Sequence, residues 1–148
     1  MLNPDFRDIL SAFNEERVEF LLVGAYALAV HGIPRATGDI DLWIHRSEDN
    51  SRRVWQALAN FGAPLAGRTA EELQTPDVVF QVGVPPNRID ILTSLDGVAF
   101  DEAWPARTEV IIDGIRVPVI GRGHFIRNKK AVGRPQDLAD VARLESGE

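Results

Sequence analysis

Residues 20–45 read FLLVGAYALAVHGIPRATGDIDLWIH and contain the pattern that decides the fold. The continuous apolar run Phe20–Val23 is typical of a short buried strand. Gly24 interrupts this run, and the composition of Ala25–Val30 predicts a short helix that packs on the strand. After a loop rich in glycine and proline, Asp39–His45 has an aliphatic residue at every second position, which predicts a second strand. The segment therefore predicts a strand, a helix and another strand in close succession.

The two aspartates of the second predicted strand are candidates for a cation site. Asp39 and Asp41 are two residues apart, so both carboxylates point to one face of a strand and can converge on one cation. Two close carboxylates repel each other, and a hard divalent ion such as Mg²⁺ relieves that repulsion. Taken alone, most Asp-x-Asp tripeptides are surface acids or turn residues. Asp39 and Asp41 lie at the start of an apolar strand, where a carboxylate pair needs a counter-charge.

A third acid, Asp90, lies between two isoleucines in the predicted strand Arg88–Leu92. For Asp90 alone, an outward-facing polar residue on an amphipathic strand is the simpler interpretation. Three carboxylates on two adjacent strands, however, are what two-metal phosphoryl transfer requires, because one ion orients a triphosphate and another lowers the pKa of an attacking hydroxyl. We therefore predict that Asp39, Asp41 and Asp90 bind metal and are catalytic, with Asp90 as a candidate base.

Other residues are candidates for binding phosphate. Gly24 lies where the first strand passes into the short helix, and backbone N–H groups at a helix N-terminus favour phosphate, although a tight turn explains a glycine equally well. Arg35 and Thr37 precede the aspartate pair, where each could contact phosphate or orient an aspartate. Residues 121–134 contain five basic residues and no acid, in a chain of net charge −6. This segment indicates either a local anion site or a solvated basic helix face.

The remaining sequence predicts one α/β or α+β domain over residues 1–148. Asp113-Gly114 lies between two short apolar segments and is the clearest hairpin signal in the chain. The predicted helices are 4–16, 48–61, 124–130 and 135–145, with a helical turn at 70–73, and the other predicted strands are 78–82, 88–92, 108–112 and 115–120.

Composition and charge exclude several classes of function. The chain has no cysteine, which excludes disulfides, thiolate metal sites and a catalytic thiol. Its acidic balance argues against indiscriminate binding to nucleic acid. The N-terminus does not resemble a signal peptide, and the apolar runs are too short to cross a bilayer. We therefore expect a cytoplasmic protein without a membrane partner.

Four segments together resemble a known family. Residues 22–32 and 35–42, with 85–92 and 128–140, resemble the signature of bacterial nucleotidyltransferase-like proteins. These proteins are members of the DNA polymerase beta superfamily and include relatives of the abortive-infection toxins of toxin–antitoxin pairs. The resemblance extends over nearly the whole chain. It implies the nucleotidyltransferase fold, a mixed sheet flanked by helices, with Mg²⁺ or Mn²⁺ bound by the three aspartates and an NTP as substrate.

The resemblance also implies which residues bind the nucleotide. Gly24 and Ala25 would hold the phosphates, and Lys129 and Arg134 would approach them from the C-terminal side. The two aspartates of the last predicted helix are expected to pair with these cations and to fix the helix packing: Asp137 and Asp140.

One position departs from the family pattern. Active members usually have Gly-Gly or Gly-Ser where this chain has Gly24-Ala25, and alanine lacks both the hydroxyl of serine and the backbone freedom of glycine.

An enzyme that transfers a nucleoside monophosphate to RNA or tRNA, a protein or a small molecule is one hypothesis, with the acceptor recognised by loops 62–77 and 93–107. A catalytically inactive module that binds nucleotide or a partner protein, such as a cognate antitoxin, is another. A purely structural domain would leave three carboxylates without a counter-charge.

Overall fold

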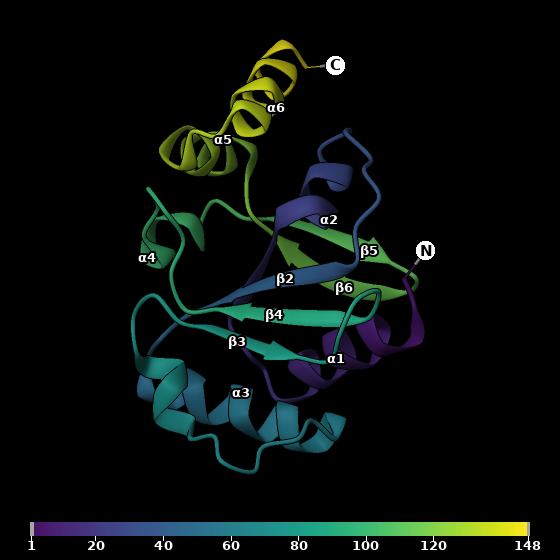
Figure 1. Ribbon diagram of the computed structural model, residues 1–148, viewed down its shortest axis with the longest axis vertical. Helices are drawn as coiled ribbons and strands as arrows, with labels where there is room; N and C mark the ends of the chain where they lie inside the picture. Colours follow the sequence, from purple (N-terminus) through teal and green to yellow (C-terminus); the bar gives the residue numbers. More distant parts are fainter. Residues whose placement is uncertain (1, 148) are drawn as a thin grey trace.

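The computed structural model describes residues 2–147 (Figure 1). Within this range, strands form one six-stranded mixed sheet in the order β3-β4-β2-β1-β6-β5. The strands are β1 (Phe20–Val23), β2 (Asp39–Ile44), β3 (Val79–Val82), β4 (Arg88–Leu92), β5 (Thr108–Ile112) and β6 (Ile115–Val119). The mixed sheet with helices confirms the predicted fold class, and the two strands that carry the three aspartates are neighbours inside the sheet.

The register of β2 with its neighbours positions the acids. β1 runs antiparallel to β2, and β4 runs parallel to β2 on its other side. Asp41 lies opposite Val23 on β1 and opposite Asp90 on β4. Ile40 and Leu42 are completely buried, so the alternate residues of β2 that include Asp41 face the opposite side of the sheet.

The helices are α1 (Pro4–Glu15), α2 (Gly24–Val30), α3 (Glu48–Phe61), α4 (Phe100–Ala103), α5 (Arg122–Val132) and α6 (Pro135–Ser146), with a 3₁₀ helix η1 (Ala70–Gln74). Helices α1 and α3 pack against each other, whereas α5 and α6 contact each other at the end of the molecule far from α3 (Figure 1). Trp55 of α3 packs edge-on against Phe80 of β3, with ring centroids 6.5 Å apart. Nearly all of the buried apolar residues of the helices and strands belong to one core cluster.

Local signals explain most helix ends. The Ser47 hydroxyl accepts a hydrogen bond from the Asn50 N–H at 3.1 Å and caps α3, and Gly62 ends this helix with φ of +94°. Gly133 ends α5 in the same left-handed conformation, with φ of +71°. Helix α5 begins two residues before the predicted position, because the Gly121 carbonyl already accepts from Phe125 N–H at 2.9 Å.

Helix α4 was not predicted, since residues 93–107 were expected to be a loop. It is a single turn of four residues, its N-cap Ala99 makes no side-chain cap, and only Ala103 in it is buried. So short a helix has no apolar periodicity to reveal it. Across residues 2–147, none of the helices has the length and apolar character needed to cross a bilayer.

Candidate active site

The structure brings the three predicted carboxylates together. Asp39 and Asp41 project from β2, and Asp90 projects from the adjoining position of β4. One carboxylate oxygen of each residue lies within 4.8 Å of the corresponding oxygens of the other two. The convergence depends on the parallel register of β2 and β4, because a shift of one residue would turn Asp90 to the other face.

This cluster fits a hard divalent cation. Its donors are carboxylate oxygens, which are the ligands that Mg²⁺ and Mn²⁺ prefer. Asp90 Oδ1 is buried and has no hydrogen-bond partner among residues 2–147. A buried acceptor without a donor is costly unless a cation or water satisfies it, so the residues present could hold such an ion.

Arg88 also lies in the cluster, although it was not among the residues predicted for the site. Its Nη2 donates to Asp39 Oδ2 at 2.9 Å and to Asp90 Oδ2 at 3.2 Å. Its Nε is 3.1 Å from Asp90 Oδ1. The expectation that a structural domain would leave the three acids without a counter-charge is therefore wrong, because Arg88 supplies one. The spacing of Arg88 and Asp90 on one strand is the sequence signal that would have found it.

The three carboxylates differ in pKa. Burial, together with the charges of Asp39 and Asp90, raises the pKa of Asp41 to about 7. Burial, together with a hydrogen bond to Asp39, raises the pKa of Asp90. For Asp39, partial burial is outweighed by hydrogen bonds from Thr37, Asp90 and Arg88, which lower its pKa. Asp41 is thus the carboxylate that most needs a further cation to remain ionised.

Thr37 and Arg35 contact aspartates. The Thr37 hydroxyl donates to Asp39 Oδ1 at 2.7 Å and so helps to orient that carboxylate. Arg35 donates through two nitrogens to Asp140 on α6, at 2.6 and 2.9 Å. The Thr37 contact corresponds to the predicted orientation of an aspartate of the pair, whereas Arg35 contacts Asp140, which does not belong to that pair.

Gly24 is packed against the site. Its φ is +70°, and a Cβ atom added to it would overlap the Asp41 carboxylate. Both the backbone conformation and the close approach therefore require glycine here. The glycine allows the turn from β1 into α2 to lie directly beside Asp41.

A cavity of about 450 Å³ opens beside the acids. Gly24 and Asp41 line one part of it, and Lys129 and Arg134 line another. The structure thus places four predicted site residues around one space. Three other residues predicted to bind nucleotide do not line this cavity: Ala25, Arg35 and Thr37.

The two cations of the cavity are held by the aspartates of α6, as expected. Lys129 is almost buried, and its Nζ is 3.0 Å from Asp140 Oδ2 and 3.6 Å from Asp137 Oδ1. Arg134 Nε is 2.7 Å from Asp137 Oδ2, although the arginine side chain is 73% exposed. The exposed Arg134 can therefore turn toward a ligand more easily than Lys129.

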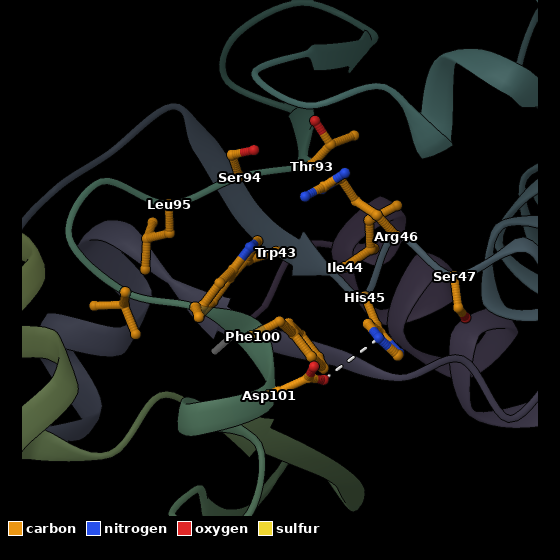
Figure 2. Close-up of a pocket in the computed structure, with 12 residues that line it drawn as sticks. Trp43, Ile44, His45, Arg46, Ser47, Thr93, Ser94, Leu95, Phe100 and Asp101 are labelled. Atoms are coloured by element: carbon orange, nitrogen blue, oxygen red, sulfur yellow. Dashed lines mark ion pairs between the residues drawn. The ribbon is translucent and has the colours of Figure 1, made fainter.

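A second cavity, of about 470 Å³, lies farther along β2 (Figure 2). Trp43 and His45 line it, and the ring of Phe100 stacks on His45 with centroids 5.1 Å apart. Ser94 and Leu95 line both cavities. The two spaces therefore adjoin each other, and Trp43 lies two positions after Asp41 on the same face of β2.

Comparison with known proteins yields structural matches. No protein-family profile matches the sequence, and no curated protein matches it. TM1012 from Thermotoga maritima, assigned as a nucleotidyltransferase, is 14% identical with a TM-score of 0.63, covering 100% of this chain and 97% of that chain. The lincosamide antibiotic adenylyltransferase LnuA, bound to lincomycin, is 15% identical with a TM-score of 0.61, covering 100% and 99%. ANT(2″)-Ia, in complex with adenylyl-2″-tobramycin, is 16% identical with a TM-score of 0.57, covering 94% and 84%.

At these identities the similarity concerns the fold alone. The matches extend along nearly the whole chain, and they agree with the mixed sheet that joins β2 to β4. The chain therefore has the nucleotidyltransferase fold.

Proposed function

We propose that this protein transfers a nucleoside monophosphate from an NTP to a hydroxyl group and releases pyrophosphate. One observation carries the proposal: Asp39, Asp41 and Asp90 meet within 4.8 Å of one another, and Asp41 lines a cavity that Lys129 and Arg134 also line. Transfer of this kind needs acids that hold divalent ions next to a cationic surface for the triphosphate. Both features lie in one place.

The three aspartates would hold Mg²⁺ or Mn²⁺, which when bound neutralises charge that develops on the phosphates. Gly24 lines the cavity next to Asp41 and presents only backbone there, so its backbone would border the phosphates. Arg134, which is exposed, and Lys129 would attract the β- and γ-phosphates. In this proposal positioning and charge stabilisation supply most of the acceleration.

Asp90 is the proposed base. The acceptor oxygen attacks the α-phosphorus, the bond to the β-phosphate oxygen breaks, and the hydroxyl proton passes to a carboxylate. Asp90 Oδ1 is buried and accepts no hydrogen bond from residues 2–147, so it is available for the proton. Burial raises the pKa of Asp90, and a carboxylate with a raised pKa is a stronger proton acceptor.

The second cavity is the proposed place of the acceptor. It adjoins the first through Ser94 and Leu95, within the segment 93–107 that was predicted to recognise the acceptor. Two proteins of the same fold bind lincomycin and adenylyl-2″-tobramycin. A cavity of about 470 Å³ is of the size that small molecules occupy. We therefore favour a small hydroxyl-bearing acceptor over RNA or protein.

Ala25 favours a second candidate function. Alanine in place of serine or glycine removes a contact that active relatives use, so the chain could bind a nucleotide, or a partner such as a cognate antitoxin, without transfer. This candidate retains the metal and phosphate contacts and lacks only turnover.

Labelled NTPs distinguish the two candidates. The chain would be incubated with α-labelled NTPs and Mn²⁺ or Mg²⁺, in separate reactions with total RNA, lysate protein, or hydroxylated small molecules that include lincomycin and tobramycin. Label on a small molecule, lost in Asp41→Asn, supports the favoured reaction. A melting point that rises with NTP and Mn²⁺ but no labelled product supports the binding module. Neither label nor a change in melting point would overturn both.

A further inference from the structure

The Arg88 guanidinium lies among the carboxylates that are proposed to bind metal. Arg88 is the first residue of β4 and lies opposite Asp39 in the parallel register. It contacts Asp39 Oδ2 at 2.9 Å and Asp90 Oδ2 at 3.2 Å. The guanidinium thus carries the only formal positive charge in contact with these two acids among the described residues.

These contacts engage the oxygens that a metal ion would use. Asp39 Oδ1 accepts from Thr37 at 2.7 Å, and Asp39 Oδ2 accepts from Arg88. Both oxygens of Asp90 lie next to Arg88, at 3.1 and 3.2 Å. A divalent ion binds carboxylate oxygen at about 2.0–2.6 Å. An ion bound to these oxygens would therefore compete with Arg88, in its present position, for the same acceptors.

The fit of Arg88 to Asp90 is incomplete. Arg88 Nε and Asp90 Oδ1 are 3.1 Å apart, yet both are buried and neither has a hydrogen-bond partner within residues 2–147. Their charges are close, but the N–H does not point at the oxygen. A well-formed arginine–carboxylate pair makes two aligned bonds. Arg88 therefore compensates the charge without satisfying the geometry of the site.

We propose that Arg88 is a resident counter-ion, which holds Asp39 and Asp90 in the metal-free protein and is displaced when a divalent ion binds. This inference rests on the proposed function, because it requires the three aspartates to be a metal site. The guanidinium stays protonated at all accessible pH values, so it can leave only by moving. The Arg88 side chain is 32% exposed, which leaves it a route toward solvent.

Exchange makes a definite claim about affinity. If Arg88 competes with the metal, its removal strengthens metal binding, because the ion no longer displaces a favourable contact or meets a like charge. If Arg88 instead holds the carboxylates in the geometry that binds metal, its removal weakens binding. A purely structural role in packing β4 leaves the affinity of the folded protein unchanged.

The test is titration of the nucleotide-free chain with Mn²⁺ alone. Binding is measured by calorimetry or by the electron spin resonance signal of free Mn²⁺. Arg88→Gln is expected to bind Mn²⁺ about tenfold more tightly than wild type, which is the order expected for loss of one adjoining charge. Arg88→Lys keeps the charge without the two-point contact, so its affinity for Mn²⁺ is expected to lie between those of wild type and Arg88→Gln. Arg116→Gln is the matched control, because Arg116 is 75% exposed on β6 and lies 4.0 Å from Glu109.

Each outcome separates the two proposals. Equal or weaker Mn²⁺ binding by Arg88→Gln overturns the exchange and leaves the proposed function intact. Should Arg88→Gln fail to fold, Arg88→Lys decides, and binding no tighter than wild type overturns the exchange. If neither wild type nor the Arg88 variants bind millimolar Mn²⁺, the metal site of the proposed function is itself wrong.

Discussion

Arg35 and Asp140 are 105 positions apart in the sequence and form a two-point ion pair, with nitrogen–oxygen distances of 2.6 and 2.9 Å. Arg35 lies in the loop before β2, and Asp140 lies on α6, where it also accepts from Lys129 Nζ at 3.0 Å. The pair therefore connects the loop that leads to the acids with the C-terminal helices α5 and α6, next to Lys129.

Replacing Asp140 should destabilise the fold. Asp140→Asn leaves Lys129, which is nearly buried, and Arg35 without their shared anion. We expect a loss of about 2 kcal/mol in the free energy of unfolding, discounted for the partial exposure of Arg35. Urea unfolding at pH 7 measures it. Glu145→Gln is the control, since Glu145 pairs with Lys130 on the surface and should change stability by less than about 0.5 kcal/mol.

Low pH should remove the stability that the Asp140 carboxylate contributes. The hydrogen bond from Arg35, with those from Lys129 and Gln136, outweighs burial and lowers the pKa of Asp140. A carboxyl whose pKa is lowered in the folded state stabilises fully above its ordinary pKa of about 4 and loses that stabilisation as the pH falls toward the folded value. Wild type should therefore lose stability below about pH 4 more steeply than Asp140→Asn, and parallel curves would refute the assignment.

The effect of Asp41 on the pH dependence of stability should be opposite to that of Asp140. Burial and the nearby acids raise its pKa to about 7, so the folded protein holds a proton there that the unfolded chain releases near pH 4. Stability is therefore lost as the pH rises from about 4 to about 7. In EDTA, Asp41→Asn should be more stable than wild type by about 2 kcal/mol at pH 8 and nearly equal at pH 4.

The measurement is thermal or urea unfolding across this pH range without metal. Mn²⁺ should narrow or reverse the difference at pH 8, because it stabilises wild type and not the variant. A variant that is less stable than wild type at pH 8 in EDTA would show that the Asp41 charge is already compensated.

Gly24→Ala tests the approach of the turn to Asp41. Two costs are expected: a positive φ for a residue with a Cβ, and overlap of that Cβ with the carboxylate. Gly32→Ala is the matched control, since Gly32 has φ of +98° but nothing within 4 Å of an added Cβ. We expect a loss of about 1 kcal/mol for Gly32→Ala and about 3 kcal/mol for Gly24→Ala in urea unfolding. Equal losses would mean that Asp41 moves aside freely.

Arg134→Gln tests the cationic side of the nucleotide cavity. Arg134 lines the cavity and is 73% exposed, so its loss should weaken NTP binding about tenfold while the fold stays intact. Lys130→Gln removes the same charge from the neighbouring helix surface, outside the cavity, and should change affinity by less than about twofold. Calorimetry with an NTP and Mn²⁺ compares the two variants, and equal effects would indicate general electrostatic attraction.

The parts of the site that could be predicted are those set by local spacing. Asp39 and Asp41 share a face because strand side chains alternate, and Asp137 and Asp140 share a face of α6 because of their helical spacing. These rules need only a few residues of context.

The contact between Arg88 and Asp39 could not be predicted in that way, and neither could helix α4. The contact of Arg88 with Asp39 depends on the parallel register of β2 and β4. The two strands are separated by 43 residues, so the local sequence does not determine this register. Helix α4 depends on tertiary packing, because its aromatic Phe100 stacks on His45 of a distant segment. In both cases long-range contacts, and not local propensity, decide the structure.

The lack of space between Gly24 and the Asp41 carboxylate has a consequence for evolution. The two positions are expected to covary: a homologue with a larger residue at position 24 should carry a shorter residue at position 41. Such a homologue would have lost one of its three acids. The glycine is thus a marker, readable in an alignment, for the lineages that retain the complete acid cluster.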